Sequence, residues 1–246
     1  MKTKKIRLGV NIDHAATLRQ VRGGETEYPD LLLLTKLLKK SGADQITIHL
    51  REDRRHIQDA DVKLLTKKSP LKINLEMAVT PAMLKVALKN KPAWVCYVPE
   101  KREELTTEGG LNVVKKIVEL KSDIQKLHKK GIRVSLFIEP DIDQVLAARE
   151  VGADAVEFHT GRWVLLKNKP AKNKEWSRLA VAAQVAHDLE LGVHAGHGLD
   201  YFHTKLIRQL PYLAEVNIGH SMICYSIFEG IQAVTQRMIQ ILKPAK

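Results

Sequence analysis

The sequence predicts a closed (β/α)8 barrel, a TIM barrel with additional helices, that uses residues 1–246 as a single domain. The first observation is that eight short runs rich in Val, Ile and Leu recur at roughly 30-residue intervals, the length of one strand–helix unit. The second is that these runs lack polar alternation, as is typical of strands covered on both faces. The third is the length of 246 residues, which α/β barrels reach as one domain.

The eight predicted strands follow one another with a helical pattern after each. They are 7–12, 45–50, 72–77, 93–98, 133–138, 155–158, 192–195 and 215–218.

The intervening segments carry apolar residues at spacings of three and four, which predicts helices. The last segment has one such stripe, formed by Ile223, Ile227, Ile231, Val234, Met238 and Ile241. Asp141 is a candidate N-cap for a helix whose apolar stripe starts with Ile142, Val145 and Leu146 and continues through Ala148. Gly42, Gly131 and Gly152 are placed to end helices directly before a strand. The long segment 111–130 has room for an extra helix outside the ring.

An open doubly wound sheet is the alternative fold. It has less support, because no G-x-G-x-x-G follows the first strand and the chain contains no P-loop.

Composition excludes several classes of protein. Two distant cysteines, Cys96 and Cys224, do not form a disulfide framework or a zinc cluster. No apolar run approaches the roughly 18 residues of a membrane span, and the basic start leads into too short an apolar run for a secretory signal. We therefore expect a cytoplasmic protein with no membrane partner. The net charge of +12 raises the alternative of nucleic-acid binding, but aromatic residues make up only 5% and no basic, aromatic-interleaved stripe is visible.

Polar residues gather after the strands, where barrel enzymes build their active sites. The seven histidines predicted at this rim are His14, His49, His56, His159, His194, His197 and His220, accompanied by the acids Asp13, Glu76, Glu139 and Glu157. Histidines and buried carboxylates transfer protons near neutral pH, so this grouping indicates several successive proton transfers, as in a condensation or dehydration.

Glycines in the last two loops predict a phosphate site. Gly196, Gly198 and Gly219 leave backbone N–H groups accessible in the part of a barrel that commonly binds phosphate. Their alternative role is to form tight turns only. Arg22, Arg51 and His56 are candidates for a second anion site.

Metal chemistry is the competing hypothesis. His194 and His197, with Glu157 or Asp13, have ligand types suited to zinc or manganese. Positions 194 and 197 differ by an odd number, however, so regular strand geometry would point them to opposite faces. The residues therefore favour a site without a metal.

Eight motifs in register resemble the pyridoxine 5′-phosphate synthase family over about residues 6–243. They are Gly9-Val-Asn-Ile-Asp-His14, the segment His49–His56, Asn74–Thr80, Val98–Arg102 with Thr106–Gly110, Val134–Ile138, His159-Thr-Gly161, Ala195-Gly-His-Gly198 and Asn217-Ile-Gly-His220.

The resemblance implies a homo-octamer that condenses 3-amino-2-oxopropyl phosphate with 1-deoxy-D-xylulose 5-phosphate, giving pyridoxine 5′-phosphate, phosphate and water. It implies that no metal and no organic cofactor is required. It implies that His49 and Glu76 are general bases, His197 a general acid and Glu157 a transition-state stabiliser. The amino-ketone phosphate would be held by Asn11, Arg22, Gly198, Gly219 and His220. The deoxyxylulose phosphate would be held by Asp13, His14, Arg51, His56 and Thr106. Residues 99–110 would form a loop that closes over both.

The chain departs from the family pattern at two places. His194 stands where the family often has Asn, and 222–225 reads Met-Ile-Cys-Tyr where small residues and an Arg are usual. The remaining alternative function is another sugar-phosphate barrel enzyme of the aldolase or isomerase type, with or without a metal.

Overall fold

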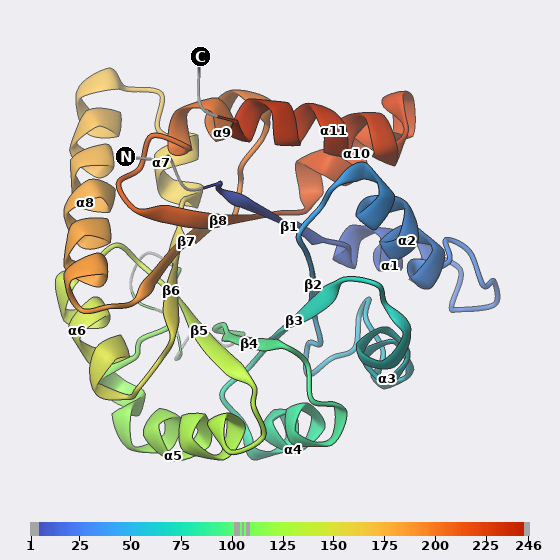
Figure 1. Ribbon diagram of the computed structural model, residues 1–246, viewed down its shortest axis with the longest axis horizontal. Coiled ribbons are helices and arrows are strands. Elements are labelled where there is room, and N and C mark those ends of the chain that lie inside the picture. Colours follow the sequence, from blue (N-terminus) through green and yellow to red (C-terminus); the bar gives the residue numbers. More distant parts are fainter. Residues whose placement is uncertain (1–4, 101–103, 105, 107–108, 244–246) are drawn as a thin grey trace.

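Eight parallel strands form a closed barrel in the order β1 to β8, as the sequence predicts (Figure 1). The structure is a computed structural model that describes residues 5–100, 104, 106 and 109–243. The strands are β1 Arg7–Asn11, β2 Gln45–His49, β3 Lys72–Met77, β4 Trp94–Tyr97, β5 Arg133–Ile138, β6 Ala155–His159, β7 Gly192–Gly196 and β8 Leu213–Ile218. The open-sheet alternative is wrong, because β1 pairs with both β2 and β8.

The described residues form eleven α-helices, which surround the barrel (Figure 1). They are α1 Asp13–Gln20, α2 Leu31–Ser41, α3 Asp59–Lys68, α4 Pro81–Asn90, α5 Ile117–His128, α6 Ile142–Glu150, α7 Gly161–Leu165, α8 Lys169–Asp188, α9 Tyr201–Ile207, α10 His220–Glu229 and α11 Ile231–Leu242. Three of them, α1, α7 and α10, begin within two residues of a strand end, so they lie at the end of the barrel where a site is expected.

Local sequence explains where several helices start and stop. Asp141 accepts a hydrogen bond from Asp143 N at 2.9 Å and begins α6, which confirms it as an N-cap. Gly42, Gly131 and Gly152 all have positive φ next to a helix end, as glycine readily does.

Three helix predictions need correction. The stripe from Ile223 to Ile241 does not belong to one helix, because Gly230 (φ 78°, ψ 143°) separates α10 from α11, and Ile227 is exposed. In α6 the buried face contains Val145 and Ala148, whereas Ile142 and Leu146 are about half exposed.

The third correction concerns segment 111–130. Its described residues form a short 3-10 helix, η2 (Val114–Lys116), that leads directly into α5. The length of this segment is therefore taken up by one ring helix and its approach, and no extra α-helix lies there.

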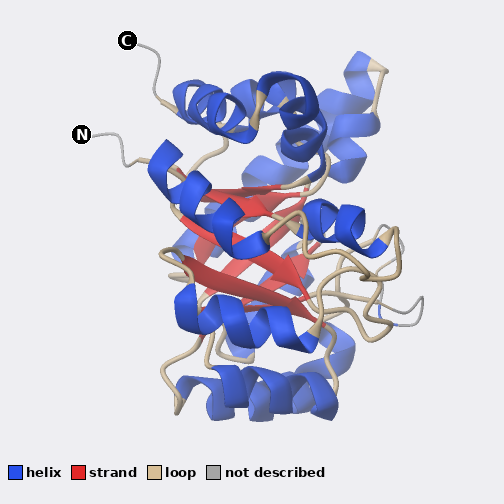
Figure 2. Ribbon diagram, turned by 90° about the vertical axis from the view of Figure 1, so that its right-hand side faces the viewer, coloured by secondary structure: helices blue, strands red, loops and turns tan. Residues whose placement is uncertain are grey.

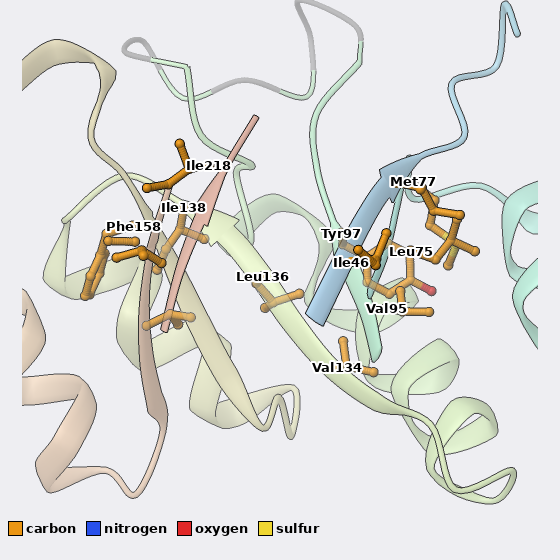
Figure 3. Close-up of a cluster of buried hydrophobic side chains, with 14 of the residues drawn as sticks. Ile46, Leu75, Met77, Val95, Tyr97, Val134, Leu136, Ile138, Phe158 and Ile218 are labelled. Atoms are coloured by element: carbon orange, nitrogen blue, oxygen red, sulfur yellow. The ribbon is translucent and has the colours of Figure 1, made fainter. Parts of the chain in front are cut away.

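The apolar core is the layer between the strands and the surrounding helices. Strand residues alternate in direction, so every second residue of each strand faces this layer. Figure 3 shows part of it, with Ile46, Leu75, Val95, Leu136 and Phe158 drawn from five consecutive strands. Each of these side chains is fully buried.

The alternate residues point inward, and the barrel interior is polar. Gln45 Nε2 donates to Glu215 Oε1 at 3.0 Å, and Thr47 Oγ1 donates to Asn217 Oδ1 at 3.0 Å. Both bonds join β2 to β8 past β1, so they lie inside the barrel. A Cβ at Gly9 would overlap Asn217 Oδ1, so glycine there makes room for this network.

Long loops gather at the carboxyl end of the strands, on the right in Figure 2. Because all eight strands are parallel, the residues at their carboxyl ends meet at this one end of the barrel. None of the helices formed by the described residues has the length and apolar composition needed to cross a membrane.

Candidate active site

A cavity of about 730 Å³ opens at the carboxyl end of the barrel. Ten of the fourteen predicted site residues line it: Asn11, Asp13, His14, His49, Glu76, Glu157, His197, Gly198, Gly219 and His220. They come from β1, β2, β3, β6, β7 and β8 or the residues that directly follow them. Parallel strands thus bring residues more than 200 positions apart into one pocket. Their chemical roles stay predictions.

Four predicted residues do not line the described part of this cavity. Arg22 is exposed in the turn after α1. Arg51 Nε lies 3.3 Å from Asp53 Oδ1, and His56 Nδ1 accepts a hydrogen bond from Ile57 N. Thr106 is partly buried, and its Oγ1 has no hydrogen-bond partner among the described residues. The predicted closing loop, 99–110, lies partly outside the described residues.

The side-chain amide of Asn11 lies between the carboxyl groups of Asp13 and Glu76. Asn11 Nδ2 donates to Asp13 Oδ2 at 2.9 Å and lies 3.4 Å from Glu76 Oε2. Burial raises the pKa of Asp13 to about 6, against the lowering effect of the hydrogen bond from His49 N. Burial, followed by the negative charges of Asp13 and Glu157, raises the pKa of Glu76 well above its ordinary value. A carboxyl group with a raised pKa is a stronger base, as proton abstraction near neutral pH requires.

His49 lies between two carboxylates, one of which the sequence did not assign. Its Nε2 is 3.0 Å from Glu100 Oε1, and its Nδ1 is 4.0 Å from Glu76 Oε2. Glu100 also accepts a hydrogen bond from Glu52 N at 3.0 Å, which fixes the carboxylate in place. The Pro99-Glu-Lys-Arg102 motif contained this residue, but its spacing gave no indication of a contact with His49.

Glu157 lines the cavity and is almost fully buried inside the barrel. Asn217 Nδ2 donates to its Oε2 at 2.6 Å, and a side chain at Gly196 would overlap its Oε1. Burial raises the pKa of Glu157 to about 8, and the charge of Glu215 adds to this, whereas the bond from Asn217 lowers it. Burial therefore favours the protonated form of Glu157 in the folded protein relative to the unfolded chain.

This shift predicts a pH-dependent stability effect for Glu157→Gln. Between pH 4.5 and about 8 the unfolded state loses the Glu157 proton while the folded state keeps it, so wild-type stability falls as pH rises through this range. The amide cannot ionise. Its Tm relative to wild type should therefore be higher at pH 8.5 than at pH 5, measured by calorimetry. A Tm difference independent of pH would show that Glu157 is ionised in the fold.

Two histidines meet at the start of α10. The rings of His14 and His220 have centroids 4.9 Å apart, and burial followed by the charge of His220 lowers the pKa of His14. Gly219, His220 and Ser221 all line the cavity at this helix N-terminus. A Cβ at Gly219 would lie 2.9 Å from Asn11 Cβ, so this close approach requires glycine.

The two departures from the family pattern lie away from the cavity lining. His194 is buried inside the barrel, 3.7 Å from Glu215 and edge-on to Trp94, so the prediction that it lies on the rim is wrong. Tyr225 stacks on Tyr201 with ring centroids 4.5 Å apart.

The metal hypothesis built on His194 and His197 is not supported. Among the described residues, one group has the spacing of metal ligands: Asp13, His49 and Glu76, whose ligand atoms lie within 4.8 Å of one another. It contains neither His194 nor His197.

Comparisons with known proteins show which family the chain belongs to. The family model for "Pyridoxal phosphate biosynthesis protein PdxJ" matches residues 8–244. The pyridoxine 5′-phosphate synthase of Bdellovibrio bacteriovorus is 59% identical, with 97% of this chain and 99% of that protein aligned. That of Photobacterium profundum is 50% identical, over 96% and 97%.

Among solved structures, 3-hexulose-6-phosphate synthase from Salmonella typhimurium has a TM-score of 0.66 at 14% identity, covering 96% of this chain and 98% of that chain. At that identity the likeness concerns the fold alone. The family match over nearly all of the chain and the 59% identity decide the assignment: the chain belongs to the PdxJ family of pyridoxal phosphate biosynthesis proteins.

Proposed function

We propose that this chain catalyses the reaction of pyridoxine 5′-phosphate synthase, in which 3-amino-2-oxopropyl phosphate and 1-deoxy-D-xylulose 5-phosphate give pyridoxine 5′-phosphate, phosphate and water. The observation that carries the proposal is the cavity itself. It gathers three carboxyl groups and five histidines among its described lining residues. Such a set suits a ring closure, which needs a proton taken from carbon and another given to departing oxygen at successive steps.

The surroundings of each group support its role. Glu76, with its raised pKa, acts as a general base. His49 acts as the second base, held by Glu100 on one nitrogen and facing Glu76 with the other. Burial, followed by the charge of His159, lowers the pKa of His197, so its protonated form is a strong acid for departing oxygen. Glu157, whose protonated form is favoured by burial, would donate a hydrogen bond to developing negative charge.

The start of α10 is the proposed site for the amino-ketone phosphate. Backbone N–H groups at a helix N-terminus attract anions, and Gly219 and His220 lie there on the cavity wall. Asn11, Gly198 and Arg22 complete this proposed set. The second phosphate would be held by Asp13, His14, Arg51, His56 and Thr106.

The assembly and location are part of the proposal. We propose a single-domain subunit of a cytoplasmic homo-octamer, supported by the resemblance to the family. It would use small phosphorylated substrates without a metal or organic cofactor and without a nucleic-acid or membrane partner.

Complementation tests this function in a cell. A bacterial strain that lacks its own member of the family and requires pyridoxine should grow without it when this chain is expressed. The Glu76→Gln variant should not restore growth, and Glu119→Gln, an exposed carboxyl on α5, should restore it fully. Absence of growth with wild-type protein that is present and folded in the cells would contradict the proposal.

A metal-dependent sugar-phosphate enzyme is the second candidate, favoured only by the grouping of Asp13, His49 and Glu76. It predicts a tightly bound divalent metal in the purified protein and loss of turnover with a chelator. The synthase proposal predicts that a chelator leaves turnover unchanged.

A further inference from the structure

A buried acid–histidine pair lies in the cavity wall beside His197, and the roles above do not use it. Glu139 follows β5, and His159 is the last residue of β6. His159 Nδ1 lies 2.6 Å from Glu139 Oε1, and Glu139 is only 1% exposed. A carboxylate bound at Nδ1 keeps a proton on that nitrogen and fixes the plane of the ring.

The His159 ring in turn packs against the ring of His197. Their centroids are 4.8 Å apart at an interplanar angle of 66°, and Phe137 packs against both. A Cβ at Gly161 would lie 2.6 Å from His159 Nε2 and 2.8 Å from His197 Cδ2. The two rings therefore lie so close to Gly161 that any larger residue at this position would clash with both of them.

The backbone of His197 is held just as tightly. His197 has φ 75°, a left-handed conformation that is unusual for a residue other than glycine. Thr160 Oγ1, which is buried next to His159, lies 2.6 Å from His197 O and 2.8 Å from Gly196 O, so its single hydroxyl hydrogen has a carbonyl acceptor in either direction. Ring and backbone are thus constrained by two consecutive residues, His159 at the end of β6 and Thr160 directly after it.

We propose that Glu139 and His159 form a positioning pair that fixes the His197 ring for proton donation and sets the pH range in which it donates. The proposal deepens the proposed function, because it rests on His197 as the general acid. Phe137 forms the apolar side of the same enclosure.

The charges around His197 define the direction of the effect. The groups that act on it are His159, whose positive charge lowers its pKa, and Glu139, whose negative charge raises it, both after the effect of burial. Glu157 from β6 and His220 from α10 line the same cavity. Removing the Glu139 charge should therefore lower the pKa of His197, and removing His159 should raise it.

Glu139→Gln and His159→Asn test the pair by two readouts. In Glu139→Gln we expect kcat to fall about 10- to 100-fold, the usual range for a supporting residue, with the KM of both substrates within about twofold of wild type. The alkaline limb of the kcat–pH profile should move to lower pH. His159→Asn, whose amide can still donate to Glu139, should move it to higher pH. Glu139→Asp, which keeps the charge, should recover most of the wild-type rate.

Titration of the His197 ring by NMR of 13C-histidine-labelled protein gives the second readout, and it needs no turnover. His197 should titrate at least about 0.5 pH unit lower in Glu139→Gln and higher in His159→Asn. If neither substrate is converted by wild type, this titration still tests the pair apart from the proposed function.

The Tm of each variant shows whether it folds. Because Glu139→Gln and His159→Asn change different members of the pair, one folded variant is sufficient for the test. Unchanged titration of His197 in a folded variant, or a rate loss expressed in KM alone, would overturn the proposal.

Discussion

Glu76→Gln should lower kcat about 10²- to 10⁴-fold, the range for loss of a group that transfers a proton in the transition state. The amide has nearly the same shape and keeps an oxygen that can accept from Asn11, so the cavity should retain its form. It cannot take up a proton as the carboxylate does. Steady-state kinetics of pyridoxine 5′-phosphate formation, with both substrates varied, would measure the effect.

The matched control is Glu119→Gln, which removes a carboxyl group that is 65% exposed on α5, away from the cavity lining. Its kinetics should equal those of wild type. Turnover of Glu76→Gln within a few-fold of the control, in folded protein, would remove Glu76 from the mechanism.

His49→Ala should lower kcat by a similar factor, about 10²- to 10⁴-fold. The substitution removes the ring that lies between Glu76 and Glu100 and leaves the buried Glu100 carboxylate without its histidine partner. Because Asp13 accepts its hydrogen bond from the backbone N of His49, that contact survives the change. The loss should therefore appear chiefly in the rate of the chemical step, measured by single-turnover kinetics.

His187→Ala provides the comparison for His49→Ala. His187 stacks on Tyr212 at the end of α8 and does not line the cavity, so its removal should leave turnover unchanged. Equal rates for the two variants would show that His49 has no part in proton transfer.

The barrel could be predicted from sequence because each buried strand forms its own short apolar run and these runs recur at the length of one strand–helix unit. All eight strands lie within two residues of their predicted bounds. The helix errors have a different cause. Gly230 interrupts a continuous apolar pattern, and spacing alone does not show that its backbone leaves the helical region. In α6 Val145 and Ala148 are buried as predicted and Ala147 is buried with them, whereas Ile142 and Leu146 are about half exposed, because an apolar stripe read from spacing does not fix which of its edges faces the core.

Much of the site could be predicted for the same reason: residues at the carboxyl ends of parallel strands meet. The sequence could not show which side-chain atoms of these residues contact one another. Glu100 contacts His49 through a loop whose path no strand pattern determines. His194 was predicted at the rim with His197, but it lies in the middle of β7, where strand alternation turns it into the barrel toward Trp94.

The basic residues behind the net charge of +12 do not gather in the described cavity lining. The described residues that line it include histidines and carboxyl groups but neither Lys nor Arg. Most of the positive charge therefore lies elsewhere, where its field can raise the encounter rate of doubly charged anionic substrates.

Product formation from the two substrates tests the central claim most directly. Purified protein, treated with chelator and then supplied with 3-amino-2-oxopropyl phosphate and 1-deoxy-D-xylulose 5-phosphate, should yield pyridoxine 5′-phosphate, identified by mass spectrometry. An equal amount of inorganic phosphate should appear, and neither substrate alone should give product. If folded, untreated protein forms no pyridoxine 5′-phosphate from the pair, the account is contradicted.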